Sequence, residues 1–558
     1  MLKVRKRYET IEHSFVSLDI ENDPSGKMIW VCLYDGEKFH HFQDWESVLQ
    51  HIGSKLGHDK RYSTVYAHNG GGWDWLSLID HLLSSSDEII DCVMSGSRMI
   101  MARVKLGIHT VSLVDSFTLF WAKLDEVGRK LLNIGKIDTA NVLPHTLLRR
   151  DKKTFLAYVE RDTKLCYDSV VKFGEILHNK VAPIQSLGVT LASTAMKVFT
   201  TGYMETAINT PDSKYLKGIL REGYSGGRVQ CLKAGHFNNV WVYDINSLYP
   251  YVMSTTEVPV SAKGYFTKRW VPGSVGCFRV KFSGKYPIPV FMQRGEAVKS
   301  GEGVFYSPEI QRHIDCGGTI EVIEGYVFTE TKLLFGEYVR ILYEMRKQNK
   351  GTVLDWAAKL LLNSLYGKFG MKSEREAIVR IAPSQLSQYI KSGKVRPIDE
   401  ERDIYAVSTE VDAPYIHVGI AAMITSAARV QLHKAMDFNT VYVDTDSIHS
   451  TVQRGDLEIG TELGQFKIEA EGEGVYLGKK LYGVRGTETK IRLKGVKLKR
   501  KVDDDNGADV RFDDLLAILK GTTKQFKYRT PATVREVLQK GYQSCKFYPR
   551  KRAIRKTK

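Results

Sequence analysis

Two runs of strand-forming residues, far apart in the chain, each carry two acidic residues at positions i and i+2. They are "SFVSLDIEN" (14–22), which contains Asp19 and Glu21, and "YVDTDSIHS" (442–450), which contains Asp444 and Asp446. Residues two apart in a strand point to the same face, about 7 Å from each other, so carboxylates there repel one another unless cations lie between them. Such runs present oxygen ligands on a rigid support, which suits Mg²⁺.

The second run leaves two structural interpretations open. "DTD" either lies along one strand or forms the tip of a hairpin that joins "NTVYV" to "SIHSTV". Taken alone, the run is explained just as simply by an Asp-rich surface turn. A further acidic segment is needed before a metal site is favoured.

That segment is "WVYDINSLYP" (241–250), in which Asp244 ends an apolar, β-rich run and Pro250 ends the strand. Asp244 together with Asp444 and Asp446 gives three carboxylates. Such a cluster can hold two Mg²⁺ ions, the arrangement that clamps the attacking and leaving oxygens in phosphoryl transfer.

Two predicted helical segments supply cations and an aromatic ring. In "DWAAKLLLNSLYGKFG" (355–370), Lys359, Asn363 and Tyr366 fall at i, i+4 and i+7, on one helix face. Upstream, "YEMRKQNKG" offers Arg346 and Lys347. Cations for phosphates and a flat ring for a base are what a nucleoside triphosphate requires, although a solvated amphipathic helix explains either segment by itself.

A second acidic set lies near the N-terminus. Besides Asp19 and Glu21, "AHNGGGWDWLSL" contributes Asn69 and Asp74, and "YVERD" places Tyr158 and Asp162 one helical turn apart. Four carboxylates from three segments can again hold two divalent ions, with the tyrosine placed to orient an attacking water.

Composition limits the class of protein. A chain of 558 residues with 43% apolar residues predicts three or more domains or subdomains. The net charge of +17 favours a polyanionic partner, nucleic acid first, over a basic enzyme without one. Seven scattered cysteines argue against a disulfide framework or a zinc site, and the lack of a signal-like or membrane-spanning run predicts a soluble intracellular protein.

The order of predicted elements changes along the chain. Up to about residue 182, short strands alternate with helices, which is typical of an α/β domain. From about 220 the pattern is α+β, with strands near 238–245, 276–282, 320–328 and 440–452 and a long helical stretch over 331–368. The polar stretch 372–408 is expected to leave the sheet.

The segments at 241–250, 355–370 and 442–447 closely resemble, in this order, motifs A, B and C of the family B DNA polymerases. The resemblance implies that Asp244 and Asp446 ligate metals and that Asp444 completes the cluster. It implies further that Lys359 and the cations near Arg346 hold the triphosphate. Tyr366 is expected at the nascent base pair, and Tyr249 as the gate against a ribose 2′-hydroxyl.

The N-terminal segments look like the three exonuclease motifs of the 3′–5′ proofreading domain of that family, with Trp73 where the family has Phe or Tyr. "VDSFTLFWAKL" resembles its single-strand-binding segment, which assigns Ser116 and Leu119 to the primer end. Asn69, in the second exonuclease motif, is also expected to bind DNA. Lys136 in "IGKID" matches the family's catalytic-site lysine.

Other segments are expected to hold DNA. "REGYSGGRVQ" resembles the family's template-contacting linker and points to Tyr224, Gly226 and Gly227; "LGKKLYGV" resembles its primer-holding element and points to Lys480 and Tyr482. The stretch 490–501 carries seven basic residues and no acid, and Lys494 represents its cationic face, which is suited to bind phosphates without reading sequence.

The resemblance covers the whole chain and is nearest to the protein-primed branch found in phages, adenoviruses and linear plasmids. It predicts a ribonuclease H-like 3′–5′ exonuclease domain (1–182), an α/β unit, followed by a right-hand polymerase domain (183–558). The subdomain boundaries implied are palm about 220–295 and 409–490, first insertion about 296–333, fingers about 334–371, second insertion about 372–408, and thumb about 491–558.

The predicted function is DNA-dependent DNA synthesis with proofreading, using two Mg²⁺ ions per active site, with Mn²⁺ as a possible substitute. The expected partners are primer–template and single-stranded DNA, deoxynucleoside triphosphates and a terminal protein that primes strand-displacing synthesis. The chain is expected to be a monomer or to form a heterodimer with that protein. Its expected location is the cytoplasm of a host cell. One alternative is a DNA- or RNA-primed viral polymerase. The other is an inactive DNA-binding homologue; such a protein would lack a metal-binding carboxylate, and none is missing from this sequence.

Overall fold

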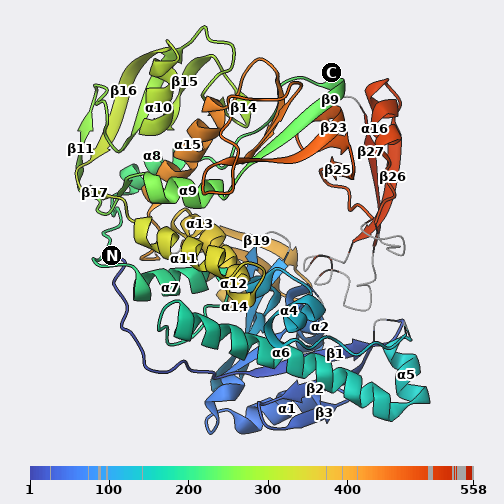
Figure 1. The fold of residues 1–558 in the computed structure, drawn as a ribbon. Coiled ribbons are helices and arrows are strands. Elements are labelled where there is room, and N and C mark those ends of the chain that lie inside the picture. The colour runs from blue at the N-terminus through green and yellow to red at the C-terminus, as the bar shows by residue number, and fades with distance from the viewer. Residues whose placement is uncertain are drawn as a thin grey trace.

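The protein is described from a computed structural model (Figure 1). The structure describes residues 1–558 apart from 26, 73, 86–89, 96–97, 141, 373, 393, 411–412, 500–506, 531–532, 534–535, 537–538, 540–547 and 556–558. Figure 1 shows the N-terminal elements at one end, β9, β23, α10 and α15 at the other, and α7, α11 and α12 between them.

The N-terminal part is an α/β unit built on three central parallel strands. β1 (Val16–Asn22) runs parallel to β4 (Thr64–Ala67), and β4 runs parallel to β7 (His109–Asp115), because helical crossovers separate these strands in sequence. Antiparallel strands extend the sheet on both sides: β2 (Met28–Tyr34), β3 (Phe39–Phe42), β5 (Ile90–Ser95) and β6 (Arg98–Leu106).

Helices pack around this sheet, and their buried faces form its core. The longest, α6 (Lys152–Lys180), buries Phe155, Val159 and Phe173. The remaining helical elements of this part are α1 (Trp45–Lys55), η1 (Lys60–Ser63), η2 (Gly70–Gly72), α2 (Asp74–Ser85), α3 (Phe117–Phe120), α4 (Leu124–Leu132) and α5 (Pro144–Arg150).

A segment from much later in the chain joins the same sheet. The stretch 372–408 leaves the C-terminal sheet, as its polarity predicts, and forms β18 (Glu374–Arg380), α14 (Pro383–Ser392), β19 (Lys394–Asp399) and β20 (Ile404–Glu410). β18 pairs antiparallel with β5, with Ala377 opposite Val93 and Ile378 opposite Cys92. The result is one sheet in the order β19-β20-β18-β5-β6-β7-β4-β1-β2-β3.

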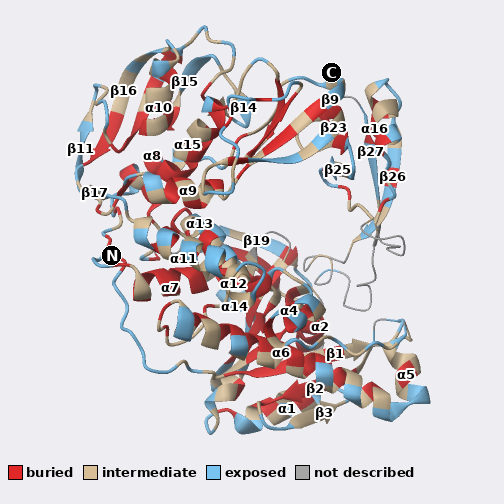
Figure 2. Ribbon diagram, in the orientation of Figure 1, coloured by how far each residue is buried: buried red, intermediate tan, exposed pale blue. Residues whose placement is uncertain are grey.

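The C-terminal part is built on a seven-stranded antiparallel sheet in the order β25-β24-β23-β9-β22-β21-β8. Its strands are β8 (Val229–Cys231), β9 (Gly235–Ile245), β21 (Thr440–Asp444), β22 (Ser447–Ser450), β23 (Phe466–Gly478), β24 (Leu481–Arg485) and β25 (Thr489–Leu493). α15 (Val418–Lys434) is almost wholly buried, and Figure 2 shows that it lies where buried segments of this part meet.

The helical stretch predicted over 331–368 consists of α11 (Gly336–Gln348), α12 (Val353–Ser364) and the short α13 (Tyr366–Phe369). The break between α11 and α12 falls at Gly351, whose φ of 80° is a conformation that glycine adopts at low cost. These helices pack against α7 (Leu191–Gly202) and α9 (Leu248–Thr255), so they connect the two parts of the molecule.

Smaller elements complete the fold. A four-stranded sheet in the order β11-β16-β12-β15 comprises β11 (Gly264–Thr267), β12 (Gly276–Ser283), β15 (Ser300–Tyr306) and β16 (Thr319–Phe328), beside α10 (Ser307–Asp315). The others are α8 (Lys214–Glu222), β10 (Val258–Pro259), β13 (Met292–Gln293), β14 (Glu296–Ala297), β17 (Thr331–Lys332), α16 (Phe512–Leu519), β26 (Lys524–Thr530) and β27 (Tyr548–Ile554). Within the part of the chain that the structure describes, no helix is both long and apolar enough to cross a membrane.

The added strands share the hydrophobic core of the N-terminal unit. Ile404, 1% exposed, packs in the same cluster as Val104 and Cys92. We therefore expect Ile404→Ala to lower the free energy of unfolding by about 2–5 kcal/mol, through lost burial and the cavity left behind. Hydrogen–deuterium exchange in β6 should rise as well, because the core under that strand loosens.

The matched control is Ile390→Ala on α14, where the side chain is 59% exposed and the expected change is within about 0.5 kcal/mol. Urea unfolding and exchange mass spectrometry measure both effects. Equal behaviour of the two variants would contradict a shared core.

Candidate functional site

Asp444 and Asp446 lie at the tip of a hairpin, which decides between the two interpretations of "DTD". β21 ends at Asp444 and β22 begins at Ser447, opposite it, so Thr445 and Asp446 form the turn. Thr445 has a φ of 66°. Asp444 is thus the last paired residue of its strand, and Asp446 lies in the turn itself.

Strand pairing brings Asp244 to the same place. β22 pairs with β9 so that Ser447 lies opposite Asp244, and the Ile245 N–H donates to the Asp446 carbonyl at 2.8 Å. Three carboxylates from segments that are distant in sequence therefore meet at one end of the seven-stranded sheet.

In this centre the three carboxylates repel one another, and two lysines form ion pairs with them. Burial, and then the charges of Asp244 and Asp444, raise the pKa of Asp446 to about 6. Lys467 Nζ lies 2.7 Å from Asp244 Oδ1, and Lys480 Nζ lies 2.6 Å from Asp444 Oδ1. Sequence reasoning missed Lys467; its only signal is its place in β23, directly opposite Asp244.

Two tyrosine rings stack beside the acids. The ring centroids of Tyr249 and Tyr366 are 4.5 Å apart, with planes 11° from parallel. Arg346 faces the same region, because its Nη1 donates to Ser247 Oγ at 3.3 Å while its Nε donates to Asp355 at 2.9 Å. Lys359 and Asn363 are exposed on α12.

Lys347, in contrast, forms an exposed pair with Glu462, with 3.0 Å between Nζ and Oε1. The side chain of Arg346 therefore points toward Ser247, three residues after Asp244, whereas that of Lys347 points toward Glu462 on the surface.

The loop containing Tyr224, Gly226 and Gly227 packs against both acidic motifs. A Cβ on Gly227 would come within 2.8 Å of Thr445 Cγ2 and 2.9 Å of the Tyr249 hydroxyl, so only glycine fits. Arg429 Nη1 donates to the carbonyls of Ser225 and Gly226 at 2.6 and 2.8 Å.

Arg429 is itself paired with Glu309 of α10, with 2.5 Å between Nη2 and Oε2, and both side chains are buried. Because Glu309 holds Arg429 in place, Arg429 in turn fixes the loop that contains Gly226 and Gly227. Sequence reasoning missed this pair, because neither residue stands in a segment with another chemical signal.

The second acidic centre is at the end of β1. Asp19 and Glu21 lie in that strand, Asp74 begins α2, and Asp162 lies in α6. Asp74 Oδ1 accepts a hydrogen bond from the Ile20 N–H at 3.2 Å, which ties the helix start to the strand.

Burial is the main cause of the raised pKa values in this centre. It raises the pKa of Glu21 to about 7 and that of Asp74 to about 7, and it raises the pKa of Asp19 well above its ordinary value, with the charges of Asp162, Glu21 and Asp74 adding to the effect. The Tyr158 hydroxyl hydrogen-bonds to Glu21 and opposes the shift there.

Lys136, which was expected to be a lysine of this site, reaches into the centre, with 2.5 Å between its Nζ and Asp162 Oδ2. The other oxygen, Asp162 Oδ1, is buried without a hydrogen-bond partner in the described structure.

The side chains of both centres are of the chemical type that binds divalent cations. Carboxylate oxygens are the ligands that Mg²⁺ prefers, and the unpaired Asp162 oxygen is available to a cation. Among the described residues, however, no three His, Cys, Asp or Glu side chains converge closely enough to form a ligand group. Lysines lie against Asp244 and Asp444 at one centre and against Asp162 at the other, so the acids must draw together around any metal.

The residues expected at the primer end differ in exposure. Arg98 Nη2 donates to Asn69 Oδ1 and to Asp115 Oδ2, both at 2.6 Å, and Arg98 lies over the Phe117 ring at 4.3 Å. Ser116 and Leu119 are fully buried, so the structure places them to support this surface rather than to line it. Trp73 lies outside the described residues.

The DNA-holding residues of the C-terminal sheet cluster near its edge. Lys480 lies in the turn between β23 and β24, Tyr482 follows in β24, and exposed Lys494 follows β25. Residues 500–501 of the basic stretch lie outside the described part of the chain.

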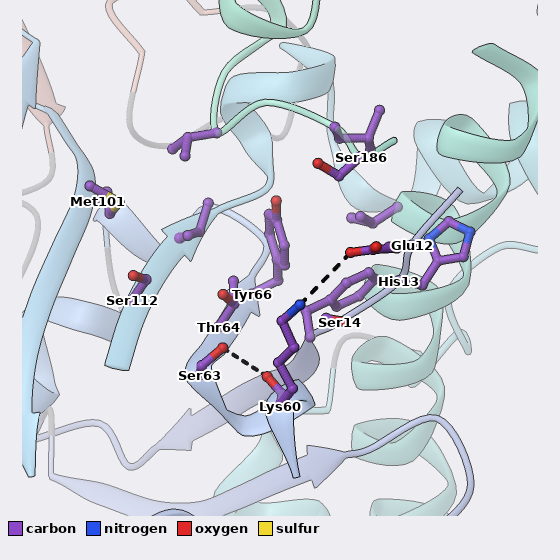
Figure 3. A pocket seen from close by; sticks show the side chains of 15 residues that line it. Glu12, His13, Ser14, Lys60, Ser63, Thr64, Tyr66, Met101, Ser112 and Ser186 are labelled. Atoms are coloured by element: carbon purple, nitrogen blue, oxygen red, sulfur yellow. Dashed lines mark hydrogen bonds and ion pairs between the residues drawn. The ribbon is translucent and has the colours of Figure 1, made fainter. Parts of the chain in front are cut away.

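A cavity of about 290 Å³ lies at the opposite end of β1 from the acids (Figure 3). Glu12 and Lys60 approach each other across it, with 3.9 Å between their charged atoms. None of the residues predicted for either centre lines this cavity.

Comparison with known proteins identifies relatives. Residues 150–413 match the family described as DNA polymerase type B, organellar and viral. A probable DNA polymerase of Podospora anserina is 27% identical over 86% of this chain and 51% of its own length, and the DNA-directed DNA polymerase of Enterobacteria phage PRD1 is 26% identical over 88% and 87%. A probable DNA polymerase of Neurospora intermedia is 28% identical over 60% of this chain and 38% of its own length, so the chain spans about half or less of these fungal relatives.

A solved structure supports the architecture. Phi29 DNA polymerase, in complex with primer–template DNA and incoming nucleotide substrates, superposes with a TM-score of 0.73 at 16% identity, over 98% of this chain and 100% of that one. The predicted fold class, a ribonuclease H-like exonuclease-type domain followed by a right-hand polymerase-type domain, is therefore confirmed.

The histidine behind the primer-end residues makes stability depend on pH. His68 Nε2 is 3.0 Å from the Ala122 carbonyl, Nδ1 is 3.0 Å from Ser116 Oγ, and burial lowers the pKa of His68 to about 4. Because the unfolded chain protonates near pH 6.5, the stability conferred by neutral His68 is present above that pH and is lost as the pH falls to about 4. We expect His68→Gln to remove about 3 kcal/mol of this pH-dependent loss.

The measurement is urea unfolding at pH 7 and pH 4.5 for the wild type, His68→Gln and a control, His58→Gln, at an exposed position. The same pH slope in the wild type and His68→Gln would show that His68 is charged in the folded state.

Proposed function

Because residues 150–413 match the family of organellar and viral type B DNA polymerases, we propose that the chain is a DNA-dependent DNA polymerase with a separate 3′–5′ exonuclease centre. The observation that carries the proposal is the meeting of Asp244, Asp444 and Asp446 beside the stacked rings of Tyr249 and Tyr366. An acid cluster with an aromatic wall fits a triphosphate and a base at one site.

In the polymerase centre, Asp244, Asp444 and Asp446 hold Mg²⁺, which when bound supplies positive charge at the attacking and leaving oxygens. Arg346 and Lys359 neutralise the triphosphate, and Asn363 lies on the same helix face as Lys359. Lys347, which was expected to join them, is paired with Glu462 instead. Tyr366 packs on the nascent base pair. Tyr249, buttressed by that ring, fills the space of a ribose 2′-hydroxyl.

In the exonuclease centre, Asp19, Glu21, Asp74 and Asp162 hold the second pair of Mg²⁺ ions. The Tyr158 hydroxyl orients a water, and Lys136 keeps Asp162 charged through their contact. Asn69, fixed by Arg98, binds the last unpaired nucleotides, with Ser116 and Leu119 supporting it from beneath.

Duplex DNA is held by the C-terminal part. The backbone of Gly226 and Gly227 and the ring of Tyr224 contact the template, Lys480 and Tyr482 contact the primer, and Lys494 contacts phosphates. We propose the domain limits 1–182 and 183–558, with palm, fingers, thumb and two insertions at the boundaries given above.

We also propose that a terminal protein supplies the first primer hydroxyl and that synthesis displaces the non-template strand. The two stretches at about 296–333 and 372–408, which match in position the two insertions expected of the protein-primed branch, support this proposal, and the match to the phage PRD1 enzyme covers 88% of this chain and 87% of that one. A DNA- or RNA-primed polymerase of the same family is the competing function.

The two centres predict separable activities. Asp444→Asn with Asp446→Asn should lower nucleotide addition on the order of a thousandfold, since several kcal/mol of charge stabilisation disappears, and should leave degradation of single strands intact. Asp19→Ala with Glu21→Ala should do the reverse. Primer extension and degradation of a labelled oligonucleotide, with and without Mg²⁺, measure both; loss of both activities in either variant would argue against two centres.

Protein priming predicts a labelled product. Incubation of the enzyme with labelled deoxynucleotides, Mg²⁺ and candidate proteins encoded nearby should attach one nucleotide to a Ser, Thr or Tyr hydroxyl of one candidate. The Asp444/Asp446 variant is the control and should attach none. Efficient extension of oligonucleotide primers without any labelled candidate would favour the competing function.

A further inference from the structure

Four aromatic rings are packed together behind the hairpin that carries Asp444 and Asp446. We call them the tyrosine box: Tyr442 of β21, His449 of β22, Tyr476 of β23 and Tyr482 of β24. The Tyr442 ring lies 4.6 Å from that of Tyr482 and 5.6 Å from that of Tyr476, and His449 is 5.1–5.6 Å from all three tyrosines. Each ring is therefore held by the other three.

His449 fixes the back of the box. Its Nδ1 is 2.7 Å from the Tyr476 hydroxyl, and the side chain is almost completely buried. Burial lowers the pKa of His449 to about 3, so the ring is neutral and pairs with that hydroxyl through Nδ1. Its ring lies against the three tyrosine rings of the box.

Tyr442 connects the box to the turn that carries Lys480. The Lys480 N–H donates to the Tyr442 hydroxyl at 2.9 Å, and the Lys480 carbonyl accepts from the Lys494 N–H at 2.8 Å. Lys480 has a φ of 57°, in the left-handed region that side-chain-bearing residues rarely adopt. Both backbone hydrogen bonds therefore hold a conformation that the turn does not favour by itself.

This conformation decides where the two lysines of the turn point. Lys479 Nζ bonds to the Gly295 carbonyl and lies 2.5 Å from Glu296 Oε1, whereas Lys480 Nζ lies 2.6 Å from Asp444 Oδ1. If Lys480 relaxed to an ordinary backbone conformation, its side chain would leave the acidic centre.

We propose that Tyr442 is a positioning residue: its hydroxyl holds the turn so that the Lys480 ammonium faces Asp444 and the primer end, while His449 and Tyr476 keep the Tyr442 ring in place. The inference rests on the proposed polymerase function and specifies how that site retains its primer.

The test is steady-state primer extension by full-length Tyr442→Phe over a range of primer–template concentrations. The KM for primer–template should rise about fivefold, the effect of one ordinary hydrogen bond, with kcat changed less than about twofold. Degradation of single strands should be unchanged. The matched control is Tyr306→Phe, which removes a buried hydroxyl that donates to the Leu220 carbonyl at 2.8 Å; it should lower the thermal unfolding midpoint comparably and leave KM unchanged.

A double-mutant cycle with Lys480→Ala separates positioning from general support. If Tyr442 acts through Lys480, Tyr442→Phe should have no further effect on KM in the Lys480→Ala background. A wild-type KM in Tyr442→Phe, or a full additional effect in that background, would overturn the inference alone. A wild-type protein that fails to extend a primer with Mg²⁺ would overturn the proposed function, and the inference with it.

Discussion

Repulsion among carboxylates is the constraint on which both candidate centres depend. Asp74 is buried and Asp446, Asp19 and Glu21 are partly buried, all of them beside like charges, and their pKa values are raised accordingly. Such groups stay together only where covalent and hydrogen-bonded structure leaves them no alternative. The hairpin at Thr445 and its pairing with β9 provide that structure at one centre, and the junction of β1 with α2 provides it at the other.

Lysines partly relieve the repulsion in both places. Lys467 and Lys480 each contact a carboxylate of the polymerase-type centre, and Lys136 contacts Asp162. A single positive charge on a flexible stem neutralises an acid but can move aside, whereas a fixed arginine fork could not do so as easily. The same contacts that stabilise the crowded acids are therefore compatible with their later use as ligands.

The sequence predicted the parts of each centre that are local. Acids at i and i+2 in β-rich runs, and an acid at a strand end, were visible as patterns, and so was the α/β rhythm of the first 180 residues. Contacts made by long-range pairing were not visible. Lys467 is opposite Asp244 only because β23 pairs with β9, and Arg429 reaches Ser225 only because α15 packs against that loop. Neither register has a local signature, and the burial of Leu119 likewise follows from tertiary packing.

The pairing of β18 with β5 is also a long-range contact without a local sequence signature, and it links the two parts of the molecule. An insertion between two polymerase motifs was expected to leave one sheet, and nothing in its polar composition said that it would enter another. By pairing with an edge strand it satisfies backbone groups that would otherwise be open to another chain. It also places Ile404 and Ile378 in the N-terminal core. Residues 374–410 follow α11 and α12, the helices that carry Arg346 and Lys359, but share a core with the N-terminal acidic centre. Any displacement of one centre relative to the other must therefore bend the chain at the ends of this segment or break the β18–β5 pairing.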